Sequence, residues 1–325
     1  MRTVIIIVSW QSGPHLEPTV ASALAQAGPG DRVVVWDNAS AGATQAALDA
    51  LTQRFAELIV YRSAENLGFA GGNNAAAARH RDCDTILTLN PDAVLKPDAL
   101  AEMRAVLSAN PDVGAVGAVQ LTPDERTIDG LGDVVHLSGL AWRTGHGRPT
   151  GDLAARLERM GPTSEIFAPC AAAALYRRSA FDAVGGFDED YFCYCEDNDL
   201  GMRLRLAGWR SLRANRARVL HVGAISTGPD SDFSVYHGQR NLVWTFAKNL
   251  PAPLLVALLP VHLLMTGVVM AHYARAGRFG VILRAKRDAL RGLPAALAKR
   301  RETQSGRRIG SWALLRQLDR SLLRR

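Results

Sequence analysis

The stretch RTVIIIVSW (residues 2–10) has the pattern of a buried β-strand, because it is short, rich in β-branched residues and followed by turn-forming residues. Further strands are predicted at residues 31–40, 57–63, 84–93 and 113–121. Helical segments separate them, at residues 16–27, 43–55, 73–81 and 97–109. This alternation predicts an α/β fold with a Rossmann-like, mostly parallel sheet flanked by helices.

Polar residues stand at the ends of three of these strands. Ser9 ends the first strand, Asp37 lies at the end of the second, and Asp92 lies near the end of the fourth. Ligands in open α/β sheets bind outside the carboxyl ends of the strands. These three residues are therefore candidates for a binding site.

The pattern changes after residue 121. Residues 122–165 read as an irregular, glycine-rich segment, and a long loop of this kind in a compact domain is usually functional. Order returns with strands predicted at 166–178 and 211–223 and helices at 179–184 and 198–207. We expect one α/β domain over residues 1–225, with halves at 1–95 and 96–225, and a helical region over residues 226–325.

The positive charge of the chain is concentrated in its last part. The 325 residues carry a net charge of +7, but residues 272–325 hold fifteen Lys and Arg against three Asp and Glu, a net +12. This region has few aromatic residues, whereas nucleic-acid binding calls for basic and aromatic residues interleaved on a folded face. We therefore expect no nucleic-acid partner, and anionic lipid suits the charge better.

An apolar segment precedes this basic region. Residues 254–271 carry no formal charge. The length of this segment, eighteen residues, is at the low end for a helix that spans a membrane. Three arrangements fit: a membrane span, an interfacial hairpin, or buried helices that pack on the first domain. We expect attachment to a membrane.

The four cysteines are Cys83, Cys170, Cys193 and Cys195, and none forms a C-x-x-C pair. No secretion signal is recognised, so reduced thiols in a cytosolic compartment are expected.

A cluster of acids stands out in YFCYCEDNDLGMRLRLAGW (residues 191–209), where Glu196, Asp197 and Asp199 lie within four positions. Acids at a helix start interact favourably with free N–H groups and the helix dipole. A catalytic carboxylate is the alternative, with residues 191–194 as apolar walls and with Glu196 and Asp199 as like charges that raise the pKa of Asp197. From these residues alone both interpretations stay open.

Three other motifs are each ambiguous alone. The segment RSAENLGFAGGNNAAAARH (62–80) is a glycine turn that opens a helix, which suits either a phosphate contact or a tight helix entry. Asp92 in LTLNPDAVL is either a ligand for Mg²⁺ or Mn²⁺ or a turn aspartate. His221 in VLHVG is either structural or functional.

The order of these motifs carries more information than any one of them. VSWQSG, DNAS, ENLGFAGGNN, LNPDA, VGGFDEDYFCYCEDNDLGMRLRLAGW, VLHVG and RNLVW together resemble an inverting family 2 glycosyltransferase with the GT-A fold, in its rhamnosyltransferase-like branch. The resemblance covers residues 3–249. It implies that 1–95 is a nucleotide-binding half and 96–225 an acceptor half.

The resemblance also implies roles for single residues. Asp197 is the catalytic base, with Glu196 as the next candidate, and Asp92 and His221 hold Mg²⁺ or Mn²⁺. Residues expected to contact the donor are Ser9, Asp37, Asn66, Gly71, Gly72, Asn73, Asn90 and Arg240. The family's D-x-D-type site is reduced here to Asn90-Pro91-Asp92, and Gln11 and Cys170-Ala171 depart from its usual pattern.

The implied activity is the transfer of a sugar, with rhamnose favoured, from a dTDP- or UDP-sugar to a hydroxyl of a glycan or lipid-linked glycan. Such an enzyme would work in cell-surface polysaccharide synthesis at the cytoplasmic face of the membrane. A sugar-1-phosphate nucleotidyltransferase would want Lys and Arg in the first loop, and SWQSGPHLEP has neither. A catalytically inactive binding or scaffold module would be expected to lose Asp92, Asp197 or His221, and all three are present.

Overall fold

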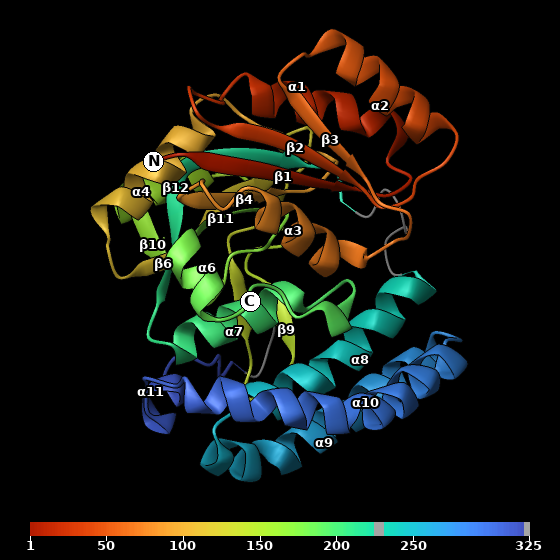
Figure 1. Ribbon diagram of the computed structural model, residues 1–325. Helices are drawn as coiled ribbons and strands as arrows, with labels where there is room; N and C mark the ends of the chain where they lie inside the picture. Colours follow the sequence, from red (N-terminus) through yellow and green to blue (C-terminus); the bar gives the residue numbers. More distant parts are fainter. Residues whose placement is uncertain (224–230, 322–325) are drawn as a thin grey trace.

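The computed structural model describes residues 1–223 and 231–321, and a mixed, mostly parallel sheet flanked by helices forms its centre (Figure 1). The strands lie in the order β10 (Thr163–Glu165), β12 (Arg210–His221), β6 (Val113–Leu121), β11 (Ala173–Arg177), β4 (Thr85–Leu89), β1 (Thr3–Ser9), β2 (Arg32–Asp37) and β3 (Leu58–Arg62). Strand β1 pairs parallel with β2 and β4, whereas β11 runs antiparallel between β4 and β6.

Shorter strands extend the sheet at the carboxyl ends of β6 and β12. Strand β5 (Ala93–Leu95) pairs antiparallel with the end of β12, and β7 (Ile128–Gly130) pairs with the end of β6. Strands β8 (Asp133–Val135) and β9 (Ala141–Arg143) form a separate hairpin. We call this segment the β8–β9 hairpin.

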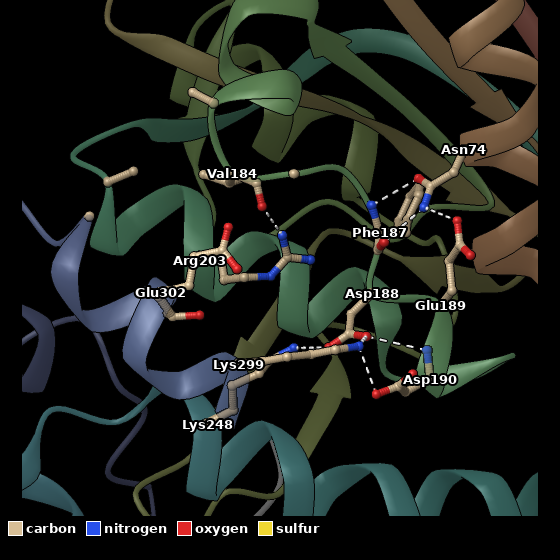
Figure 2. Close-up of a pocket in the computed structure, with 15 residues that line it drawn as sticks. Asn74, Val184, Phe187, Asp188, Glu189, Asp190, Arg203, Lys248, Lys299 and Glu302 are labelled. Carbon is tan, nitrogen blue, oxygen red and sulfur yellow. Dashed lines mark hydrogen bonds and ion pairs between the residues drawn. The ribbon is translucent and has the colours of Figure 1, made fainter. Parts of the chain in front are cut away.

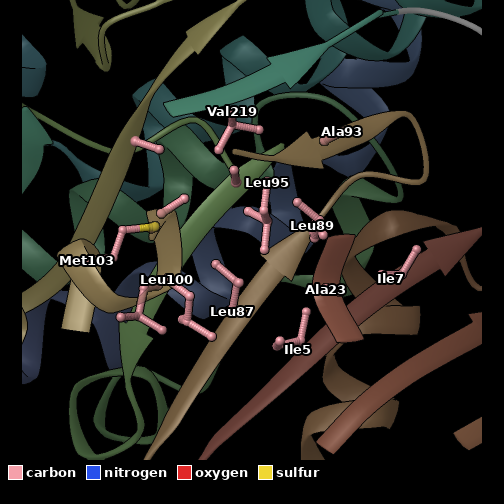
Figure 3. Close-up of a cluster of buried hydrophobic side chains, with 14 of the residues drawn as sticks. Ile5, Ile7, Ala23, Leu87, Leu89, Ala93, Leu95, Leu100, Met103 and Val219 are labelled. Carbon is pink, nitrogen blue, oxygen red and sulfur yellow. The ribbon is translucent and has the colours of Figure 1, made fainter. Parts of the chain in front are cut away.

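The first strand explains why the sheet has helices on both faces. Successive side chains of a strand point to opposite faces, and every residue of β1 is buried. Ile5 and Ile7 pack with α1 (Leu16–Leu24), α2 (Ala43–Arg54) and α4 (Ala99–Ala109) in the cluster drawn in Figure 3. Val4, Ile6 and Val8 pack on the other face, with α3 (Gly68–Arg79), α6 (Arg178–Ala183) and α7 (Glu196–Leu206).

The carboxyl-terminal helices form a separate layer beneath α7 (Figure 1). They are α8 (Asp232–Asn249), α9 (Ala252–Arg275), α10 (Phe279–Ser305) and α11 (Ser311–Leu315). Their apolar residues join the α/β domain through a cluster that includes Val135, Met202, Phe246, Leu254 and Leu314. The predicted domain boundary at residues 225 and 226 lies outside the described residues.

Three local predictions need correction. Helix α3 begins at Gly68 rather than at residue 73, so the glycine turn is part of the helix. The strand predicted at 84–93 is split into β4 and β5, because the chain turns at Asn90 and Pro91 has no N–H to donate. Residues 122–165 are not irregular: they contain β7, β8, β9, β10 and α5 (Leu153–Met160).

Candidate active site

Asp92 and His221 come together at the edge of the sheet. Asp92 follows the turn after β4, His221 ends β12, and the pairing of β5 with β12 sets His221 opposite Ala93. Nε2 of His221 lies 3.4 Å from Oδ1 of Asp92 and 3.1 Å from the side-chain nitrogen of Asn90. The other Asp92 oxygen accepts a hydrogen bond of 2.8 Å from the N–H of Gly223.

A third residue, Asp129 in β7, was missed by the sequence analysis. Its Oδ2 lies 2.8 Å from Nδ1 of His221 and 2.5 Å from the guanidinium of Arg143. Burial lowers the pKa of His221, but its contacts with Asp129 and Asp92 outweigh this and raise it to about 9. Burial would raise the pKa values of both carboxyls, but His221, with the N–H of Gly223 at Asp92 and with Arg143 at Asp129, holds them below their ordinary range.

This arrangement fits a divalent cation. When Nδ1–H of a histidine donates to a carboxylate, its other ring nitrogen is oriented to bind a metal. Asp129 is placed to orient His221 in this way, and Nε2 then faces the carboxylate of Asp92. Asp92 and His221 would supply two ligands, and a bound diphosphate could supply others.

Asp197 lies at a second position, in the first turn of α7. Its Oδ2 accepts a 3.3 Å hydrogen bond from the N–H of Ala171, and its Oδ1 accepts bonds from the backbone and side-chain nitrogens of Asn198 at 2.8 and 3.0 Å. Burial raises the pKa of Asp197 in spite of these bonds. A carboxylate with a raised pKa is suited to accept a proton near neutral pH.

Two further groups that sequence reasoning missed lie beside Asp197. Side-chain atoms of Asp133, Cys170 and Asp197 all lie within 4.8 Å of one another. Oδ1 of Asp133 has no hydrogen-bond partner among the described residues, and burial together with the charge of Asp197 raises the pKa of Asp133. Burial also raises the pKa of the Cys170 thiol, which disfavours the thiolate form that binds metals. Sulfur is in addition a soft ligand, whereas hard cations such as Mg²⁺ prefer oxygen.

Arg143 connects the two positions. It ends the β8–β9 hairpin, makes an ion pair with Asp129, and interacts electrostatically with Asp133 and Asp197. Burial opposes its charge, but Cys170 and these carboxylates raise its pKa above the ordinary value for arginine. One guanidinium therefore interacts with carboxylates of both clusters.

The three acids of the 196–199 cluster point to different surroundings. Glu196 is buried, its Oε2 has no partner among the described residues, and burial and Asp197 raise its pKa. Asp199 instead binds Arg203 and Lys248. Burial alone would raise the pKa of Asp199, but the two cations hold it well below its ordinary range. The prediction that Asp199 acts as a like charge that raises the pKa of Asp197 is therefore wrong: two cations neutralise Asp199, and burial raises the pKa of Asp197.

On the predicted donor side, the structure brings Ser9 and Asp37 together. The two residues are paired at the ends of β1 and β2, and both are buried. Oγ of Ser9 donates to Ser12 at 3.1 Å, and Oδ1 of Asp37 accepts a 3.2 Å bond from the N–H of Ser40. Their predicted contact with the donor stays a prediction.

The predicted glycine motif has structural contacts of its own. A Cβ on Gly72 would lie 2.9 Å from Val8, and one on Gly71 would lie 2.9 Å from Leu67, so both glycines allow close packing around α3. Asn73 donates to the carbonyl of Phe69 at 2.9 Å within the helix. Asn66 accepts a 2.9 Å bond from the N–H of Gly68, where the helix starts. Donor contacts by these residues also stay predictions.

Arg240 lies on α8, where it supports the loop before α7. Its guanidinium donates to the carbonyl oxygens of Asp190 and Tyr191 at 3.1 and 3.0 Å and stacks on Trp244 at 4.3 Å from the ring centroid. These contacts give Arg240 a positioning role, and its predicted contact with donor phosphate or acceptor is untested.

A cavity of about 430 Å³ lies elsewhere, between α7, α10 and the loop before α7 (Figure 2). Charged residues that line it include Asp188, Asp190, Arg203, Lys248 and Lys299. The two lysines pair with the carboxylates, as Figure 2 shows, so this cavity is already neutralised by its own side chains. Its chemistry is that of a structural ion network and differs from that of the Asp92 and Asp197 positions.

Comparison with known proteins places this geometry in context. A family model described as "Glycosyltransferase like family 2" matches residues 2–244. An N-acetylglucosaminyl-diphospho-decaprenol L-rhamnosyltransferase of Mycobacterium tuberculosis is 33% identical over 255 residues, which cover 72% of this chain and 80% of that protein. Rhamnosyltransferase WbbL of Escherichia coli K12 is 32% identical over 168 residues, which cover 46% of this chain and 59% of that protein.

Among solved structures, the mannosyltransferase PcManGT from Pyrobaculum calidifontis, in complex with GDP-Man and Mn²⁺, superposes with a TM-score of 0.56. It is 18% identical, and the match covers 94% of this chain and 85% of that one. This likeness confirms the predicted GT-A fold.

Proposed function

This chain belongs to glycosyltransferase family 2, and from that premise we propose that it is an inverting, metal-dependent transferase that moves rhamnose from dTDP-rhamnose to a hydroxyl of a glycan or lipid-linked glycan. The names of the rhamnosyltransferase relatives support the choice of sugar. A UDP-hexose is the second candidate donor. The proposed setting is cell-surface polysaccharide synthesis at the cytoplasmic face of the membrane.

The observation that carries this proposal is the pairing of Asp92 with His221, oriented by Asp129, at the carboxyl edge of the sheet. Asp92 and His221 would hold Mg²⁺ or Mn²⁺ there. Such an ion, when bound, neutralises charge on the nucleoside diphosphate that leaves. The structural neighbour that binds Mn²⁺ together with GDP-Man supports a metal-dependent reaction.

Asp197 is the proposed base. Its carboxylate accepts the proton of the acceptor hydroxyl while the hydroxyl oxygen forms a bond to the anomeric carbon of the sugar. The bond from that carbon to the diphosphate oxygen breaks, and its electron pair leaves with the nucleoside diphosphate. Attack opposite to the leaving group inverts the configuration at this carbon.

Two hydrogen bonds support this role for Asp197. The N–H groups of Ala171 and Asn198 fix the two carboxylate oxygens, so the base is oriented before the acceptor arrives. Burial raises its pKa toward the range in which a carboxylate accepts a proton effectively. The N–H groups of Ala171 and Asn198 and the charge of Arg143 favour the ionised form of Asp197 and limit this rise in its pKa.

The first test is thermal unfolding of the purified protein against dTDP, UDP and their sugars, with and without Mn²⁺. A ligand at about one hundred times its Kd adds roughly 2.7 kcal/mol of stability. We expect a metal-dependent shift with one nucleotide and its loss in Asp92→Ala. No shift with any nucleotide would favour a non-catalytic module instead.

The second test is transfer of labelled sugar to an isolated membrane fraction. Asp197→Asn should reduce transfer by about a hundred- to ten-thousand-fold and leave nucleotide binding intact, because the metal position is separate. Glu196→Gln is the matched control, and it should retain far more activity. Near-normal transfer by Asp197→Asn would contradict the assignment and make Glu196 the candidate base.

A further inference from the structure

Helix α9 exposes an apolar surface. It has 24 residues, it is long and apolar enough to cross a membrane, and it is largely exposed. Its most exposed apolar side chains are Val256, Leu263, Leu264 and Val268, at 75%, 60%, 68% and 52%. We call these four residues the α9 face. Exposed apolar surface of this kind usually marks an interaction site.

Both ends of α9 are held against the rest of the protein. Just before the helix, Leu250 is buried and its carbonyl accepts a hydrogen bond from Arg300 of α10. Just after it, Arg278 lies 3.8 Å from Asp232, the first residue of α8. Helix α9 therefore runs back along α8 from the end of that helix to its start, as Figure 1 shows.

The middle of α9 is also attached. Nδ1 of His262 lies 2.7 Å from the carbonyl oxygen of Ser138, and its ring stacks on Phe246 with 4.0 Å between the centroids. Ser138 lies in the turn of the β8–β9 hairpin. A helix whose midpoint contacts the α/β domain cannot have that midpoint at the centre of a bilayer.

Helix α10 keeps the following chain on the same side. Ile282, Ala285 and Ala289 are fully buried, and the indole N–H of Trp244 in α8 donates to the carbonyl of Ala289 at 2.8 Å. A helix of 24 residues is about 36 Å long, enough to carry its far end across a hydrocarbon core of about 30 Å. Only three residues separate α9 from α10, so a spanning α9 would place the start of α10 on the wrong side.

We propose that α9 lies in the plane of an anionic membrane surface, with the α9 face inserted among the lipids, and that it does not span the bilayer. The inference rests on the membrane location proposed above and specifies how the chain is attached. Charge supports a lipid partner: residues 272–325, which begin in the last turn of α9, carry the net +12. Apolar insertion and attraction to anionic headgroups act together in helices of this kind.

This attachment has a consequence for the active site. The β8–β9 hairpin contacts His262 of α9 through Ser138, and the same hairpin carries Asp133 and Arg143 beside the proposed base. A membrane-docked α9 would hold these groups at a fixed distance from the lipid surface. This would suit an acceptor whose own anchor lies in that surface.

Vesicle sedimentation of the full chain tests the lipid partner. We expect binding to vesicles of phosphatidylglycerol and phosphatidylethanolamine, much weaker binding to phosphatidylcholine alone, and at least a tenfold loss in the double variant Leu263→Glu, Leu264→Glu. Met160→Glu is the matched control, because Met160 is 54% exposed on α5, and it should bind as the unsubstituted protein does. If the double variant binds vesicles equally well, another surface binds the lipid and the proposal fails. If the substitutions only dissociate a dimer, the α9 face contacts a second copy of the chain and the proposal also fails.

Accessibility of the turn after α9 tests the in-plane arrangement. Two single-cysteine variants are compared: Ala276→Cys, exposed in this turn, and Met160→Cys in the α/β domain. Each is treated with an impermeant maleimide in spheroplasts and in inverted membrane vesicles, and the unsubstituted protein gives the background labelling. We expect both to react only in inverted vesicles. Reaction of Ala276→Cys only in spheroplasts would show a span and overturn the proposal while membrane attachment stands. If the protein does not bind vesicles at all, the proposed membrane location itself is wrong. Neither assay depends on transfer activity, so both outcomes can be told apart from a failure of the proposed enzyme function.

Discussion

Two lysines bind the same carboxylate from different environments, and this gives a sharp prediction about stability. Lys248 lies 2.5 Å from Oδ2 of Asp188 and 2.7 Å from Asp199, and Lys299 lies 2.5 Å from Oδ1 of Asp188 and 2.7 Å from Asp190. The distances match, but Lys248 is 1% exposed whereas the side chain of Lys299 is 41% exposed. Figure 2 shows both lysines converging on Asp188.

Substitution of each lysine by methionine should therefore have different effects. Lys248→Met removes the buried cation that Asp188 and Asp199 share, and removal of one partner of a buried ion pair costs about 3–5 kcal/mol. Lys299→Met removes a partly exposed pair, which is worth about 0–1 kcal/mol in water. Methionine retains most of the side-chain volume, so loss of packing contributes little to the difference.

Urea unfolding followed by circular dichroism measures both variants. With a denaturant slope of about 3 kcal/mol/M, Lys248→Met should lower the midpoint by about 1–1.7 M and Lys299→Met by less than about 0.3 M. The difference in midpoint between the two variants should narrow in acid. Because the fold holds the pKa of Asp199 low, the ionised form of Asp199 stabilises the fold above its unfolded pKa of about 3.9. This stabilisation is lost as the pH falls from there toward the lowered pKa of the folded state. Equal losses for the two variants at neutral pH would refute the assignment of the stabilising charge to the buried lysine.

Three further outcomes are expected. Because burial raises the pKa of Asp197 and the base must be ionised, kcat/KM should fall with decreasing pH through a pKa above the ordinary aspartate value of about 3.9; an acid limb at or below that value in the pH profile would contradict this. Burial and the charge of Asp197 raise the pKa of Asp133 and so favour its neutral form, which Asn resembles in shape and charge. Asp133→Asn should therefore retain kcat/KM within about tenfold, or 1.4 kcal/mol, and a loss as large as that of Asp197→Asn would give Asp133 a charged role. Gly68 has φ of +71°, and a Cβ there would overlap the carbonyl of Phe192. Gly68→Ala should therefore lower the free energy of unfolding, measured in urea, by about 1–3 kcal/mol. Gly238→Ala, in open space on α8, is the control and should leave the stability unchanged or raise it.

The sequence predicts the parts of the site that depend on strand ends. Asp92 follows the turn after the apolar strand β4 and His221 ends β12, and the sheet brings such strand ends to one edge, so their meeting is foreseeable from local pattern. Asp129 is different, because it lies 92 positions from His221 in a segment that reads as irregular. The sequence pattern that could have indicated Asp129 is the pair of acids close to glycines in IDGLGDVV (residues 128–135). Only the structure shows why it matters, because β7 pairs with β6.

The acidic cluster at residues 196–199 shows why sequence proximity and spatial proximity differ. Residues two positions apart on a helix project about 200° apart, so Asp197 and Asp199 face nearly opposite sides of α7. Asp197 turns toward Ala171 and the β8–β9 hairpin, whereas Asp199 turns toward Lys248 of α8 and Arg203. One run of acids thus supplies the proposed base on one side and a structural anchor on the other. Because that anchor joins α7 to α8, and α8 contacts α9 through the stacking of Phe246 on His262, the orientation of the base depends on the helical layer that holds the helix proposed to rest on the membrane.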